Sequence, residues 1–117
     1  MRVAIDAYEF VGLRGGSGGA GSYALALIEH LARDVDVRVI ASEGNSRLFT
    51  PLKERSKRIS ICRSSAGHAD AIRTATDGAD ILYAPFTALP ERPTYGHIPV
   101  VTAIHDLQHR ALRSFFP

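Results

Sequence analysis

The chain has 117 residues, of which 45% are hydrophobic and 22% are charged, a composition typical of one soluble globular domain. No apolar run approaches the roughly 20 residues that a membrane-spanning helix needs, and a formal charge of +2 is too small for a typical nucleic-acid-binding surface. The single cysteine, Cys62, excludes an internal disulfide and makes a reducing cytoplasm the expected compartment.

The first part of the chain alternates between strand and helix patterns. Residues 1–7 contain a short apolar run without polar alternation, which indicates a strand buried on both faces. The following apolar residues recur at the spacing of one helix face and predict a helix from Ala20: Ala20, Tyr23, Ala24, Leu27, Ile28 and Leu31. Residues 35–41 are rich in β-branched side chains and predict a second strand.

The middle of the chain continues this alternation. Residues 46–58 are charged, with few apolar positions, and predict a helix that Pro51 interrupts. Residues 59–63 predict a third strand. Residues 67–78 predict a helix that ends at Gly78. The side chains of Ala69, Ile72 and Ala75 are expected to face the core.

The last part of the chain supplies two more strands. Residues 80–84 and 100–104 predict strands, and the proline-rich residues 85–99 between them predict a loop. Residues 111–116 predict the beginning of another helix. The whole pattern predicts an α/β fold, a Rossmann-like open parallel sheet of about five strands with helices on both faces.

Polar groups and glycines follow the predicted strands. Ligands of open parallel sheets bind at the carboxyl ends of the strands. Those ends carry Asp6, residues 42–43, residues 83–85, and the pair His105 and Asp106. The glycine-rich residues 12–23 precede the first helix, whose free amides and dipole favour an anion that glycine allows to come close. We expect a phosphate-bearing ligand there, with a surface loop that binds nothing as the alternative.

One glycine pattern keeps a second class of protein open. Gly16, Gly18 and Gly21 formally match the dinucleotide-binding pattern G-x-G-x-x-G. That pattern requires the turn to follow its strand directly, whereas here several residues intervene, which weakens the interpretation. Glu43 could still serve as the ribose-binding acid of a NAD-dependent oxidoreductase. The chain lacks the P-loop pattern G-x-x-x-x-G-K-[ST], which argues against a nucleotide hydrolase.

Two carboxylates and a histidine are the candidate site residues. His105 can donate to a hydroxyl or phosphate oxygen, and a buried histidine bonded to the backbone is its structural alternative. Asp106 could orient His105 or cap the following helix. His105, Asp106 and His109 could be considered as metal ligands, because histidines four residues apart share a helix face. No third strong ligand is evident, so no metal site is expected. Asp6 could accept from a sugar hydroxyl, but a structural role in pinning the glycine-rich loop is favoured.

Four segments together resemble a known family. They are, in chain order, MRVAIDAYEF, GGAGSYALALIEHLAR, DILYAPFTALP and PVVTAIHDLQHRALRSFFP. These segments resemble the amino-terminal domain of the family-four glycosyltransferases. Those enzymes are retaining, have the two-domain GT-B fold and use sugar nucleotides, many of them with mannose or glucose donors. The most specific positions are Asp6, Gly19, Gly21, Tyr23, Thr102, His105, Asp106 and Leu107.

The resemblance implies a role for each candidate residue. Gly18 and Gly19 would approach the donor diphosphate, and Asp6 would support their loop. His105 would be the catalytic candidate, in contact with the transferred sugar or the acceptor, and Asp106 would lie beside it in the substrate site. The sugar nucleotide is itself a substrate, so the resemblance implies no metal and no other cofactor.

The resemblance also implies an incomplete enzyme. Residues 1–117 would be a partial amino-terminal, acceptor-side domain without the carboxyl-terminal nucleotide-binding domain. The complete enzyme would transfer a sugar with retention, in glycan or cell-surface polysaccharide synthesis. This fragment alone would bind nucleotide weakly and would not turn over. The sequence departs from the family at Tyr8, where many members carry arginine.

Several partners are therefore expected. They are a sugar nucleotide, a carbohydrate or lipid-linked acceptor, the missing carboxyl-terminal domain, and a second copy bound through an exposed sheet edge. A non-catalytic interaction module of the same fold is a third alternative, and no nucleic acid is expected. The expected location is cytoplasmic. A small basic cluster consists of Lys53, Arg55, Lys57 and Arg58. It is expected to form either a solvated face or a peripheral contact with the inner membrane face.

Overall fold

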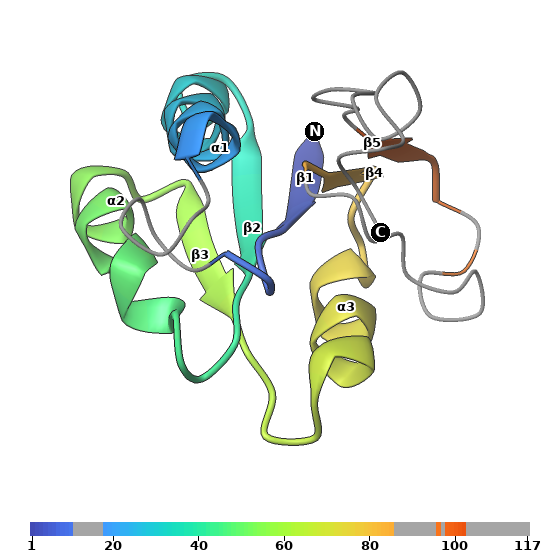
Figure 1. Ribbon diagram of the computed structural model, residues 1–117. Coiled ribbons are helices and arrows are strands. Elements are labelled where there is room, and N and C mark those ends of the chain that lie inside the picture. The colour runs from blue at the N-terminus through green and yellow to red at the C-terminus, as the bar shows by residue number, and fades with distance from the viewer. Residues whose placement is uncertain (11–17, 86–95, 97, 103–117) are drawn as a thin grey trace, which may run out of the picture.

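A parallel sheet of five strands organises the chain. The computed structural model describes residues 1–10, 18–85, 96 and 98–102. All strand pairs are parallel, and the strand order is β3-β2-β1-β4-β5. The strands are β1 (Arg2–Asp6), β2 (Asp36–Ile40), β3 (Ile59–Cys62), β4 (Ile81–Ala84) and β5 (Val100–Thr102). The predicted α/β, Rossmann-like open sheet is thus confirmed (Figure 1).

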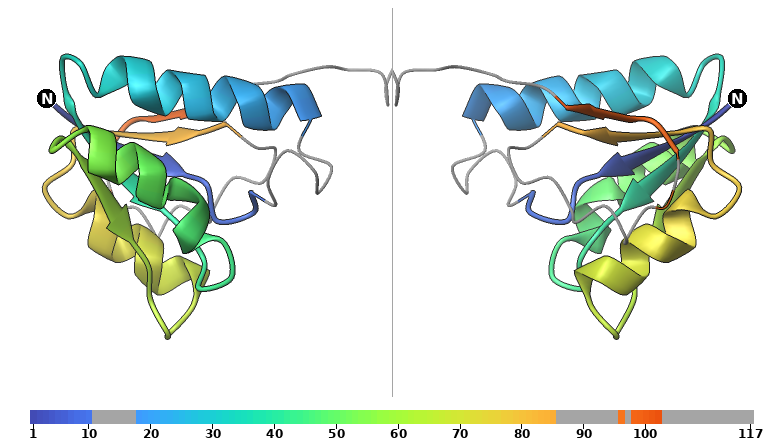
Figure 2. Two further views of the ribbon diagram at one scale, coloured as in Figure 1. Left: turned by 90° about the vertical axis from the view of Figure 1, so that its left-hand side faces the viewer. Right: turned by 90° about the vertical axis from the view of Figure 1, so that its right-hand side faces the viewer.

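Helices cover both faces of this sheet. They are α1 (Gly18–Leu31), a 3-10 turn η2 (Ser46–Phe49), α2 (Thr50–Arg55) and α3 (His68–Thr76). Side views place α1 and α2 on one face and α3 on the other (Figure 2). The chain moves from β1 outward to β3 and then crosses back to β4, so the direction reverses between β1 and β4. The carboxyl ends of β1 and β4 therefore flank the topological switch point, where open α/β sheets bind ligands.

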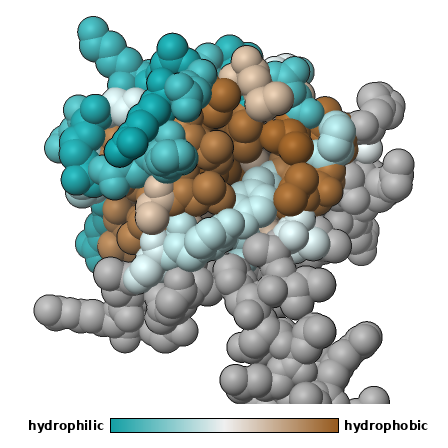
Figure 3. Space-filling view, turned by 90° about the horizontal axis from the view of Figure 1, so that it is seen from above, coloured by the Kyte–Doolittle hydropathy of each residue, from teal (hydrophilic) through white to brown (hydrophobic). Residues whose placement is uncertain are grey.

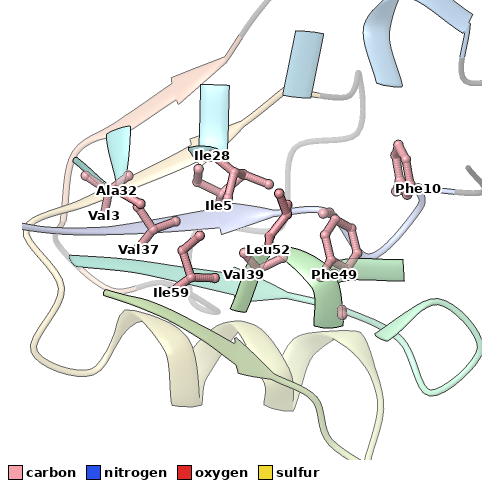
Figure 4. Packing of buried hydrophobic residues seen from close by; sticks show 12 residues of the cluster. Val3, Ile5, Phe10, Ile28, Ala32, Val37, Val39, Phe49, Leu52 and Ile59 are labelled. Atoms are coloured by element: carbon pink, nitrogen blue, oxygen red, sulfur yellow. The ribbon is translucent and has the colours of Figure 1, made fainter. Parts of the chain in front are cut away.

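The larger core lies between the sheet and the α1–α2 layer. Alternate residues of β1 and β2 point to this face, where they meet α1 and α2 (Figure 4). The ten side chains labelled in Figure 4 are Val3, Ile5, Phe10, Ile28, Ala32, Val37, Val39, Phe49, Leu52 and Ile59. The β-branched residues suit the pleated strands, and the helical spacing from Ala24 to Ile28 and Ala32 supplies the facing stripe.

The smaller core lies under α3. Ala71, Ile72 and Ala75 are buried against the sheet, whereas the expectation that Ala69 faces inward is wrong, because Ala69 is exposed. The inward stripe follows Ala71 and Ala75, which are one helical turn apart. Arg38 of β2 donates to the backbone carbonyls of Ala75, at 3.0 Å, and of Asp77, so it satisfies acceptors that the end of α3 leaves open.

The segment predicted as an interrupted helix forms two short pieces. The 3-10 turn η2 runs into α2, and Pro51 occupies the first turn of α2. At that position proline lacks only an amide hydrogen that has no partner within the helix, so α2 accommodates the residue in its first turn rather than being broken by it. Phe49 at the junction of the two pieces is 1% exposed and anchors them to the core.

Apolar surface remains on the α1 side of the molecule. Seen from that side, a band of apolar residues runs between hydrophilic ones (Figure 3). Tyr23 of α1 and Val101 of β5 are 46% and 45% exposed. These two exposed apolar side chains belong to different elements of the fold. None of the helices within the described residues combines the length and hydropathy needed to cross a bilayer.

Candidate functional site

Asp6 ends β1 beside the switch point and organises the turn that follows. Its side chain is only 6% exposed. The backbone amide of Tyr8 donates to Asp6 Oδ1 at 3.1 Å, and the amide of Phe10 donates to the carbonyl of Ala7 at 3.0 Å. The side chain of Asp6 and the backbone of Ala7 thus both help to hold the first turn after β1.

His68, the first residue of α3, supplies the partner of this carboxylate. Nε2 of His68 lies 3.0 Å from Asp6 Oδ1 and 2.9 Å from Oδ2. The helix α3 runs antiparallel to the strands, so its first residue comes to the carboxyl edge of the sheet. Gly67, which precedes His68, has φ +106°, a backbone conformation that favours glycine. The chain can therefore turn sharply into α3 and bring the imidazole over Asp6.

Tyr8 fixes the plane of the imidazole. The rings of Tyr8 and His68 stack with centroids 4.3 Å apart and planes 13° apart. The side chain of His68 keeps 28% of its surface exposed. Among the described residues, Nδ1 of His68 has no hydrogen-bond partner. With Nε2–H donating to Asp6, the neutral ring would leave Nδ1 as an acceptor for a hydroxyl, as in histidine–carboxylate pairs that take part in proton transfer.

Asn45 holds the same turn from the other side. Its Nδ2 donates to the carbonyls of Ala7 (3.0 Å), Tyr8 (3.1 Å) and Phe10 (2.7 Å). Its Oδ1 accepts the amide of Ser42 at 2.9 Å. This single amide therefore joins the loop after β1 to the loop after β2. A pocket of about 520 Å³ opens beside it, lined by Tyr8, Glu9, Phe10, Ser42, Gly44, Asn45 and Leu48.

The structure locates some of the sequence-predicted site residues. Asp6 lies at the end of β1, and Gly18 and Gly19 open α1. Because the C-terminal end of α1 leads directly into the start of β2, the first turn of α1 points toward the carboxyl edge that carries Asp6 (Figure 2). His105 and Asp106 lie outside the described residues, so the structure does not place them relative to the others.

Sequence reasoning missed His68 and Asn45. The signal for His68 was present, because a helix predicted over residues 67–78 must begin at the same edge as Asp6 if the sheet is parallel. For Asn45 the sequence offered only a turn over residues 42–45. That its amide reaches back to the β1 loop follows from the pairing of β1 with β2, in which Asp6 lies opposite Ile40.

Tyr83 and Cys62 are further reactive side chains of the sheet, and burial affects the pKa of both. The hydroxyl of Tyr83 donates to that of Tyr23 at 3.1 Å, and burial together with this contact raises the pKa of Tyr83. Burial also raises the pKa of the Cys62 thiol, against the opposing charge of Arg38, so burial disfavours the nucleophilic thiolate. Within the part of the chain that the structure describes, no three His, Cys, Asp or Glu side chains are grouped to hold a metal ion.

Comparisons with protein-family models, with curated proteins and with solved structures found no significant match for this chain. The arrangement of its own residues is therefore the basis for any functional proposal. That arrangement is a carboxylate, an imidazole and a stacked phenol at the switch point, next to the first turn of α1.

The burial of Asp6 predicts a pH-dependent contribution to stability. Burial raises the pKa of its carboxyl, against the lowering effects of His68 and of the Tyr8 amide, and the charge of Glu9 raises it further. A raised pKa means that the folded state takes up a proton at higher pH than the unfolded state does. The stabilisation from Asp6 is then complete below about pH 4 and is lost as pH rises through the raised pKa.

Urea unfolding of the wild type and of Asp6→Asn, from pH 7 to pH 4, tests this prediction. As pH falls, the wild type should gain stability relative to the variant, because only the wild type has this carboxyl to protonate. His68→Gln is the companion variant, and it should enlarge the gain because it removes a group that lowers the pKa of Asp6. A difference between wild type and Asp6→Asn that stays constant with pH would contradict the prediction.

Proposed function

We propose that the chain is the acceptor-side half of a retaining glycosyltransferase that takes its sugar from a sugar nucleotide. The proposal depends above all on one observation: Gly18 and Gly19 open α1 at the edge of the sheet where Asp6 ends β1. Asp6 holds the turn at Tyr8 that leads toward the glycine-rich segment. The resemblance of four sequence segments to the family-four glycosyltransferases supports the same assignment.

The chemistry explains why glycines and a helix start suit this reaction. Departure of a nucleoside diphosphate leaves oxocarbenium character on the sugar and negative charge on the phosphate. Free amides in the first turn of α1 would stabilise that charge, and glycine lets the phosphate come within hydrogen-bond distance of them. The departing phosphate would accept the proton of the acceptor hydroxyl on the same face of the sugar, which gives retention.

In this proposal the Asp6–His68 pair serves the acceptor side. Asp6 engages Nε2 of His68 and the ring of Tyr8 fixes the imidazole plane, so Nδ1 is available to accept a hydrogen bond from a sugar hydroxyl. The second domain of a GT-B enzyme would hold the nucleotide and close the crevice against water. That domain is a further partner in the proposal, together with the carbohydrate or lipid-linked acceptor.

The NAD-dependent oxidoreductase is the competing function, because dinucleotide-binding domains share the strand order 3-2-1-4-5. In those domains the glycine turn follows the first strand at once and opens the helix. Here β1 ends at Asp6 and α1 begins only at Gly18, so a longer connection separates them. This separation favours the transferase over the oxidoreductase.

Titration of the 117-residue chain with nucleotides tests the proposal. Amide resonances of Gly18 and Gly19 should shift with GDP-mannose or UDP-glucose, with a dissociation constant on the order of 1 mM, about 4 kcal/mol of binding free energy. Reduced NAD should cause no comparable shift. These 117 residues alone should release no nucleoside diphosphate, because the proposed reaction also needs a second domain that grips the nucleotide.

A variant within the helix start supplies the sharper test. Gly19→Ala should weaken sugar-nucleotide binding about tenfold, because its methyl group obstructs the phosphate. Alanine is a better helix former than glycine by about 1 kcal/mol, so the variant should remain folded. Ser22→Ala, in the same helix and exposed, is the matched control and should bind as the wild type does. Tighter binding of reduced NAD than of either sugar nucleotide would favour the oxidoreductase instead.

A further inference from the structure

A second polar site lies at the β3 edge of the sheet, away from the Asp6–His68 pair. There the 3-10 turn η2, the helix α2 and the segment after β3 enclose a groove of about 440 Å³. The residues that line it are Ser46, Arg47, Thr50, Lys53, Ile61 and Arg63. None of these residues belongs to the cluster at the switch point.

The groove gathers positive charge that the sequence does not reveal as a group. Arg47, Lys53 and Arg63 come from three separate elements, and no carboxylate is among the described residues that line the groove. The basic run noted in the sequence divides differently in space. Arg55 pairs with Glu29 at 3.3 Å, and Arg58 donates to the carbonyl of Asp34 at 2.9 Å.

Three cations that share one groove repel one another unless an anion lies between them. Among the described residues, none of the three forms an ion pair within 4.0 Å, and Arg63 donates to the hydroxyl of Ser46 at 3.4 Å. Guanidinium groups match phosphate oxygens in geometry, an ammonium group adds a point charge, and the hydroxyls of Ser46 and Thr50 add neutral donors. The charge and the donor set both suit a phosphate dianion.

We propose that this groove binds a phosphate group, as a phosphomonoester or a pyrophosphate. The inference does not rest on the proposed transferase activity, because the two sites share no residue. The phosphate could belong to a small soluble metabolite or to the headgroup of an anionic lipid, since both present the same oxygens to Arg47, Lys53 and Arg63.

The test compares two triple variants that lose the same charge. Arg47→Gln/Lys53→Gln/Arg63→Gln empties the groove of cations, whereas Arg33→Gln/Lys57→Gln/Arg73→Gln removes three exposed cations elsewhere. Each protein is titrated with inorganic phosphate and with pyrophosphate at constant ionic strength, and the amide resonances of Ser46, Arg47 and Lys53 are followed. Because all six substituted residues are exposed, both variants should fold, and thermal unfolding checks this.

We expect saturable shifts in the wild type, at least tenfold weaker binding in the groove variant, and less than a twofold change in the control variant. Equal weakening in both variants, or shifts that never saturate in the wild type, would overturn the proposal. Sedimentation with phosphatidylcholine vesicles, with and without phosphatidic acid, separates the two sources of phosphate. Groove-dependent binding to phosphatidic acid that pyrophosphate displaces supports a headgroup, and phosphate binding without vesicle binding supports a soluble ligand.

Discussion

Replacing Asn45 with alanine should lower the free energy of unfolding by about 2–4 kcal/mol. The side chain is 5% exposed and its Nδ2 serves the carbonyls of Ala7, Tyr8 and Phe10. Alanine would remove this donor from all three carbonyls, although the carbonyl of Ala7 keeps the amide of Phe10. Each buried group that loses its partner costs about 1–3 kcal/mol. Chemical denaturation followed by circular dichroism measures the loss.

Glu43→Ala is the matched control for Asn45→Ala. Glu43 lies in the same turn and is exposed, so its replacement should change stability by less than about 0.5 kcal/mol. Because Asn45 also holds the turn that Asp6 and Tyr8 share, Asn45→Ala should in addition broaden the amide resonances of residues 7–10. A stability loss below 1 kcal/mol would mean that the turn after β1 does not depend on this side chain.

Replacing Phe49 with alanine should cost about 3–5 kcal/mol, the range measured for large buried aromatic side chains. Phe49 is 1% exposed, and its ring lies 5.4 Å from that of Phe10 at an angle of 50° (Figure 4). Its removal would leave a cavity at the junction of η2 and α2 and would take away the surface against which Phe10 packs. Urea unfolding should show a lower midpoint with a similar slope.

The neighbouring residue provides the control for Phe49→Ala. Leu48 is 41% exposed, so Leu48→Ala removes apolar volume next to the same position at a cost of less than about 1 kcal/mol. If the two variants lost equal stability, the packing assigned to Phe49 would be wrong. Loss of stability in Phe49→Ala alone would instead show that η2 and α2 depend on the core for their position.

The sheet was predictable from the sequence because its signals are local and agree with one another. The run at residues 1–7 is apolar without polar alternation, as a strand buried on both faces requires, and residues 35–41 are rich in β-branched side chains. The periodicity that begins near Ala20 identified α1, although the helix starts at Gly18. Helix ends depend on capping and on contacts outside the helix, so propensity places them less well than it places helix centres.

The contacts of the candidate site were less predictable, because they join distant parts of the chain. Asp6 and His68 are 62 positions apart, and no local pattern pairs them. The position of Asp6 followed from the end of β1, but its partner required the strand order and the direction of α3. The groove at the β3 edge shows the same limit. Arg55 and Arg58 lie near Lys53 in the sequence but have partners elsewhere, whereas Arg47 and Arg63 line the groove together with Lys53.

The central place of β1 has a consequence for how the polypeptide folds as it leaves the ribosome. The first strand of these 117 residues lies in the middle of the sheet, and the amide of Arg2 meets the carboxylate of Asp80 across 78 residues of sequence. A nascent chain that has reached only β3 can satisfy one side of β1 and leaves the other side open to water or to another chain. Folding should therefore be slow and late, completed only after β4 emerges, with an exposed strand edge in the meantime that chaperones could recognise.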